Sequence, residues 1–103
     1  MLSMLLAVLL IQDQDPQLQR VVQSWSDCLF RYAHEQARGI QSPHWISGRA
    51  FDMCRWHEGQ LRTQWARVHG RHPVEQDITR LKADARPMLS SHVERARQRG
   101  FVR

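Results

Sequence analysis

The stretch DPQLQRVVQSWSDCLFRYAHEQARG, residues 15–39, decides the fold of this chain. Its apolar side chains recur at steps of three and four residues, the spacing of one face of an α-helix. Asp15 can cap a first turn, Pro16 fits the first helical position, and Gly39 stands where a glycine commonly ends a helix. We therefore predict a helix over about 16–38. Its apolar stripe comprises Leu18, Val21, Val22, Trp25, Cys28, Leu29, Tyr32, Ala33 and Ala37.

The same start signal recurs downstream. Ser42-Pro43 opens a second periodic segment and His72-Pro73 opens a third. The second predicts a helix over about 43–69, with the stripe Ile46, Ala50, Met53, Cys54, His57, Leu61, Trp65 and Val68. The third has the stripe Val74, Ile78, Leu81, Ala85, Leu89 and Val93.

Pro87 lies inside the third segment, where a proline removes an N–H donor and crowds the preceding turn. We therefore expect helices at about 73–86 and 87–99, or one kinked helix. With 103 residues and no alternating strand pattern, residues 12–103 predict one all-α domain. The expected architecture is a three- or four-helix up-down bundle.

The cysteines predict one inter-helix disulfide. Cys28 and Cys54 lie on the first two stripes, equally far from a turn centred near Gln41, so they face each other in an antiparallel hairpin. A loop of this length corresponds to about 3.5 kcal/mol of stabilisation. Two buried thiols are the alternative. We predict no metal or cofactor, because Cys54 and His57 form only one close pair of potential ligands and a structural zinc site needs four.

Residues 1–11, MLSMLLAVLLI, are apolar except for Ser3 and carry no charge. A helix of that length spans about 16 Å, roughly half of a bilayer core. Such a run before the polar QDQDPQ is typical of the hydrophobic region of a secretory signal. The run lacks a preceding Lys or Arg and a following small-x-small site, so an anchor or a buried first segment remain alternatives. We predict an exported, periplasmic protein, which agrees with a disulfide.

The charge balance favours anionic partners. The sequence has fifteen basic and ten acidic residues, a net charge of +5. This charge attracts anions in general and does not identify a particular partner. The closing segment is basic without acidic residues between its arginines. We treat Arg95, Arg97, Arg99 and Arg103 as a candidate anion-binding tail for phosphate or anionic lipid. No nucleophile elbow, paired-carboxylate motif or nucleic-acid motif is present, so we predict no catalytic residues.

A line of tryptophans and arginines is the candidate partner surface. Trp45, Arg49, Trp56 and Arg67 fall near one line of the expected helix 43–69, away from Cys54. Tryptophan and arginine are favoured anchors in interfaces. A bundle helix must nevertheless contact two neighbours, and this helix has no other wide apolar face. We therefore expect the third helix to cover the line.

The pattern Trp25-x-x-Cys28-Leu29, a second cysteine on the next helix and a closing Pro/Leu/Arg-rich segment resembles small, uncharacterised exported helical proteins of Gram-negative bacteria. The resemblance implies a periplasmic, disulfide-stapled bundle and transfers no activity. The function expected is that of a binding or structural accessory module without catalysis. The alternative is a cytoplasmic basic helical protein that binds nucleic acid or another polyanion.

Export can be tested directly. Residues 1–30 fused to a reporter that is active only outside the cytoplasm should give activity, because the apolar run before QDQDPQ would direct translocation. Reporter activity in whole cells is the measurement. Absence of activity, also when the reading frame is extended upstream, would contradict the prediction.

Overall fold

Helix α2 (Pro16–Gln36) begins where the sequence predicts. The computed structural model describes residues 15–100, so the signal-like segment 1–11 lies outside the described residues. The Asp15 carboxylate accepts a hydrogen bond from the Leu18 N–H at 2.9 Å. Ser42 caps α3 (Pro43–Met53) in the same way, accepting from the Trp45 N–H at 3.0 Å. Each cap satisfies an N–H that the helix itself leaves without a partner.

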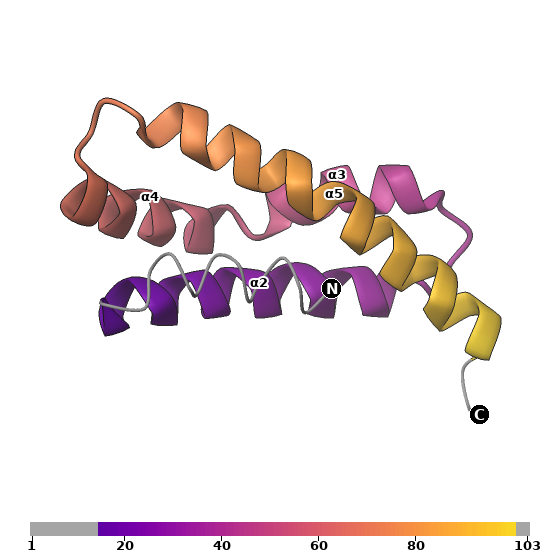
Figure 1. The fold of residues 1–103 in the computed structure, drawn as a ribbon. Helices are drawn as coiled ribbons and strands as arrows, with labels where there is room; N and C mark the ends of the chain where they lie inside the picture. The colour runs from indigo at the N-terminus through magenta and orange to yellow at the C-terminus, as the bar shows by residue number, and fades with distance from the viewer. Residues whose placement is uncertain (1–14, 101–103) are drawn as a thin grey trace.

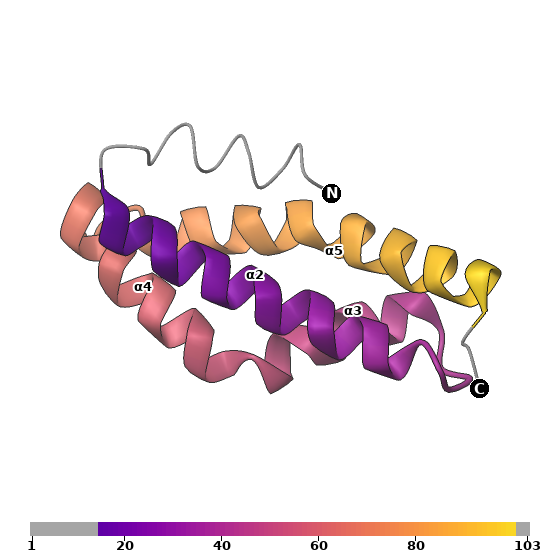
Figure 2. The ribbon, with the colours of Figure 1, turned by 90° about the horizontal axis from the view of Figure 1, so that it is seen from below.

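The described residues form four helices and no strand: α2, α3, α4 (Arg55–His69) and α5 (Val74–Arg99). In Figure 1, α3 and α4 follow one another antiparallel to α2, and α5 returns along both. The view in Figure 2 shows α2 running along the α3–α4 arm, with α5 on its other side. The predicted all-α up-down bundle is confirmed, as an elongated body of 45 × 22 × 19 Å. Across residues 15–100, no helix has the length and apolar character to cross a membrane.

The second arm differs from the single helix predicted over 43–69, because it breaks at Cys54. The backbone there has φ −103° and ψ 26°, outside the helical range. The Cys54 N–H still donates to the Ala50 carbonyl at 2.9 Å, and the Cys54 carbonyl accepts from the Glu58 N–H at 3.1 Å. The break is therefore a bend between two helices. Neither proline nor glycine marks it in the sequence.

The predicted disulfide is present at this bend. Cys28 and Cys54 are bonded, with their Cα atoms 6.0 Å apart, inside the range that disulfides span. The bond joins the middle of α2 to the junction between α3 and α4. It therefore fixes the register of the two antiparallel arms.

Of the two alternatives for the closing segment, a pair of helices or one helix, the structure has one helix, since α5 runs through Pro87. Pro87 and Ala83, whose carbonyl the missing N–H would have bonded, are both exposed. Water can therefore satisfy that carbonyl. Ala85 and Leu89, on either side of the proline, are buried and hold α5 against the bundle.

The core follows the predicted stripes with one displacement. On α2 and α5 nearly every predicted stripe residue is buried or partly buried. On the second arm, Met53 is exposed and Phe51 is buried in its place. The Phe51 ring stacks with Trp25 of α2, with centroids 6.3 Å apart. Met53 and Phe51 both lie on α3 before the bend, and Phe51 follows Ser47 by one helical turn on the face that packs against α5.

The disulfide should dominate the stability of this small bundle. We expect Cys28→Ser and Cys54→Ser each to lower the free energy of unfolding of the oxidised protein by about 3.5 kcal/mol, because either change removes the same bond. Urea unfolding with and without reductant is the measurement. The double variant should resemble the single variants, and a fully additive loss would contradict the prediction.

Candidate functional site

A polar seam joins α5 to the α3–α4 arm. At one end, the Ser47 and Ser90 hydroxyls share a hydrogen bond of 2.8 Å. Further along, the Lys82 ammonium lies 5.3 Å from the centre of the Phe51 ring and the Arg86 guanidinium 5.8 Å from it. Both distances permit cation–π attraction. Polar side chains thus form part of the contact between this arm and α5, beside the buried apolar residues of α5.

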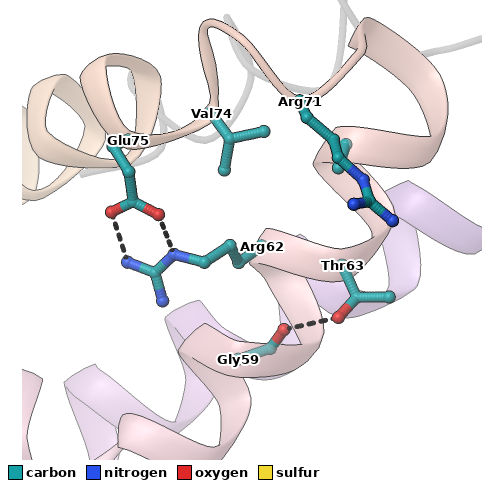
Figure 3. Close-up of a pocket in the computed structure, with 7 residues that line it drawn as sticks. Gly59, Arg62, Thr63, Arg71, Val74 and Glu75 are labelled. Carbon is teal, nitrogen blue, oxygen red and sulfur yellow. Dashed lines mark hydrogen bonds and ion pairs between the residues drawn. The ribbon is translucent and has the colours of Figure 1, made fainter.

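An ionic network continues the seam into α4. Glu58 is 7% exposed, and its two carboxylate oxygens accept from Arg62 at 3.1 Å and from Lys82 at 3.2 Å. Arg62 also forks onto Glu75 of α5, with contacts of 2.6 and 3.1 Å, as Figure 3 shows. The hydrogen bond to Glu75 is the main reason that the Arg62 pKa rises above its ordinary value. The pairing offsets the cost of burying the Glu58 charge.

The pocket drawn in Figure 3 lies between α4 and the start of α5 and has a volume of about 370 Å³. Its Arg62, Thr63 and Glu75 side chains are already engaged. The Arg62 guanidinium points to Glu75, and the Thr63 hydroxyl donates to the Gly59 carbonyl at 3.1 Å. Nearby, the Trp65 indole donates to the Asp77 carboxylate at 2.8 Å. These residues form a structural joint between the helices.

The structure leaves the predicted tryptophan line uncovered. Trp45 is 46% exposed and Trp56 is 70% exposed, so the expectation that the third helix covers them is wrong. The physical reason is the polar seam: α5 packs against the face that carries Ser47, Phe51 and Glu58. That face packs against α5, so the arm has its second neighbour without burying the tryptophans.

Arg49 remains beside Trp45. The two residues share a shallow pocket of about 570 Å³ with His44, Gly48, Asp52 and Arg86. Trp56 lies further along the arm, on α4, where its ring makes an edge contact with His57 at 5.1 Å. We call Trp45, Arg49 and Trp56 the tryptophan surface.

Arg67 is tied to the start of α2. Its guanidinium contacts Asp15 at 2.7 Å and Gln64 at 2.6 Å. The hydrogen bond from Arg67, together with that from the Leu18 N–H, holds the pKa of Asp15 below its usual value. Arg67 therefore supports the N-cap of α2, a role that differs from the predicted one in a partner surface.

The residues of the predicted basic tail lie in different environments. Arg97 donates to three backbone carbonyls: Ala37 at 2.9 Å, Gly39 at 2.9 Å and Gln41 at 2.6 Å. A guanidinium at these carbonyls complements the negative end of α2. Arg97 thus closes the turn after α2 and is not positioned as a free anion-binding group. Arg103 lies outside the described residues.

Arg95 and Arg99 lie elsewhere on α5. They line a small pocket together with His34 of α2 and His92 of α5. The periodicity of the arginines alone did not predict this meeting, because His34 belongs to another helix.

The ionic network of Glu58, Arg62, Glu75 and Lys82 was not predicted from the sequence. A charged residue between apolar positions is normally solvated, so Glu58 gave no sign of burial. The spacing of Glu58 and Arg62, four residues apart on one helix, was the available signal. Within residues 15–100, no group of three or more His, Cys, Asp or Glu side chains is placed to hold a metal ion.

Comparison of this chain with protein-family models, with curated proteins and with solved structures gives no match.

Arg97 should matter more for stability than Arg80, an exposed arginine on the same helix. We expect Arg97→Gln to lower the free energy of unfolding by about 1–3 kcal/mol, because backbone carbonyls at the end of α2 lose a charged donor. The matched control is Arg80→Gln, an exposed charge loss on the same helix, which should cost less than about 0.5 kcal/mol. Urea unfolding of both variants is the measurement, and equal effects would contradict the role of Arg97.

Proposed function

We propose that this protein is an exported binding module without catalysis, and that it docks an acidic segment of another protein on the tryptophan surface. The observation that carries the proposal is the exposure of Trp45 and Trp56 on a bundle that buries its other tryptophans, Trp25 and Trp65. A small domain gains stability by burying such rings. Two that stay in solvent support a role in contact with a partner.

The chemistry around Trp45 indicates the kind of partner. Arg49, Arg86 and His44 line the same pocket, and Asp52 is the single carboxylate among its described lining residues. An apolar ring beside two guanidinium groups suits apolar side chains flanked by carboxylates. The net charge of +5 adds long-range attraction for the same partner.

The distance between the tryptophans sets the length of the docked segment. Trp45 of α3 and Trp56 of α4 lie eleven positions apart, on either side of the bend at Cys54, so the docked segment has to extend along both helices. A helical segment of about three turns is long enough to run along eleven positions of the arm. We therefore favour an amphipathic acidic helix over a single side chain as the occupant.

The disulfide supports export, and the engagement of the carboxylates supports a function without catalysis. Disulfides persist in oxidising compartments, so the Cys28–Cys54 bond fits a protein outside the cytoplasm. Glu58, Glu75 and Asp77, the carboxylates nearest the pocket of Figure 3, all make structural contacts.

Binding can be tested with designed peptides. We expect a labelled amphipathic helix with leucines on one face and glutamates beside them to bind the oxidised protein. Trp45→Ala, Trp56→Ala and Arg49→Gln should each weaken this binding about tenfold, as for interface anchors. Fluorescence anisotropy is the measurement. Because both tryptophans are exposed, the variants should unfold within about 1 kcal/mol of the native protein.

Two controls make the result specific. Ile40→Ala removes another exposed apolar side chain, 97% exposed, which lies in the turn between α2 and α3 and does not line the Trp45 pocket, and it should not change binding. A peptide with every glutamate replaced by glutamine should bind about tenfold more weakly. Equal binding of both peptides, or unchanged binding by the tryptophan variants, would contradict the proposal.

A further inference from the structure

The C-terminal ends of α2 and α5 enclose a small pocket whose described lining is basic or neutral. It has a volume of about 100 Å³ and is lined by His34, His92, Arg95, Ala96, Arg99 and Gly100. We call this the imidazole–arginine pocket. None of these lining residues is acidic, so the guanidinium groups of Arg95 and Arg99 meet no carboxylate from the described lining.

The two imidazoles come from different helices and lie close together. The His34 and His92 ring centroids are 5.5 Å apart, and the Phe30 ring lies edge-on to His92 at the same distance. The Nε2 atom of His92 is buried and has no hydrogen-bond partner among the described residues. A buried polar atom without a partner is uncommon in a folded protein. It leaves one hydrogen-bonding atom of His92, a residue that lines the pocket, unsatisfied by the described residues.

The surroundings of His92 disfavour its charged form in the free protein. Burial is the largest cause that lowers the pKa of His92, followed by the positive charges or dipoles of His34, Arg95 and Arg99. Those are the titratable and charged groups that face His92, one from α2 and two from α5. A bound anion would reverse this balance, because it supplies the counter-charge that the pocket lacks.

We propose that the imidazole–arginine pocket binds a phosphate group, and that protonation of its histidines strengthens the binding. Arginine forks match the oxygens of a phosphate, and imidazolium groups add further charged donors. The pocket volume suits a single tetrahedral oxyanion and is too small for a nucleotide base or a sugar in addition. The group can belong to inorganic phosphate or to the headgroup of a phospholipid.

A metal ion fits this pocket less well. Two imidazoles provide only half of the ligands of a structural zinc site. The described lining residues add no carboxylate or thiolate, and the adjacent guanidinium groups repel a cation. The same charges attract an anion.

Titration of the oxidised protein with inorganic phosphate tests the proposal. Calorimetry measures the affinity, and NMR of the His92 imidazole reports its pKa, which should rise on binding. Sulfate keeps two negative charges over the whole pH range of the experiment, so a change of its affinity with pH comes from the histidines. Sulfate affinity should increase about tenfold from about pH 8 to about pH 6, where histidines become protonated.

Matched variants locate the site. Arg95→Gln/Arg99→Gln should weaken phosphate binding about tenfold or more, because two charged donors are lost. Arg20→Gln/Arg80→Gln removes the same net charge from exposed positions outside the pocket and should leave the affinity within about twofold. His34→Gln, at an exposed position, should abolish most of the pH dependence of sulfate binding without unfolding the bundle.

Vesicles separate the two sources of the phosphate group. Phosphatidylcholine vesicles with and without phosphatidic acid are mixed with the protein and sedimented. Phosphatidic acid should increase the binding of the native protein and of Arg20→Gln/Arg80→Gln to the vesicles. If it does not increase the binding of Arg95→Gln/Arg99→Gln, the pocket binds a lipid headgroup. Binding of inorganic phosphate alone assigns it to the free anion. No response to either probe, or equal losses in both double variants, would overturn the proposal.

Discussion

The covalent bond between Cys28 and Cys54 constrains two helices and the bend between α3 and α4 together. It fixes the antiparallel register of α2, so that Trp25 packs against Phe51. The same register brings Arg67, near the end of α4, to the N-cap carboxylate of α2. With that pair of arms aligned, α5 packs against a surface whose shape is already set. Burial of apolar surface gives a small bundle little stability, so the disulfide contributes much of what holds this register.

The bundle has two different seams. The α2 seam buries apolar side chains, which contribute stability roughly in proportion to their area. The α5 seam places Glu58 out of water and compensates it with Arg62 and Lys82. Buried charges are tolerated only with close partners, so this seam restricts how α5 can lie. Its position is also what leaves Trp45 and Trp56 in solvent.

The arginines of this protein have several different structural environments. Arg97 closes the turn after α2, and Arg62 links α4 to α5. Arg49 lies beside an exposed tryptophan, whereas Arg95 and Arg99 line a pocket with two imidazoles. Where a guanidinium meets a carboxylate or carbonyl, its role is structural. Arg95 and Arg99, whose described pocket lining holds no carboxylate, are available to an anion, and Arg49, whose pocket holds Asp52 as its single carboxylate, is proposed to meet an acidic partner.

The sequence by itself determined the helical class, the start of α2 at Asp15, the start of α3 at Ser42 and the pairing of Cys28 with Cys54. These features follow from caps and from spacing along one chain, which are local properties. Only the tertiary structure decided that the second arm bends at Cys54 and that α5 passes through Pro87 as one helix. It also decided which charged residues are buried. Burial of a charge depends on partners from other helices, and periodicity along one helix carries no information about them.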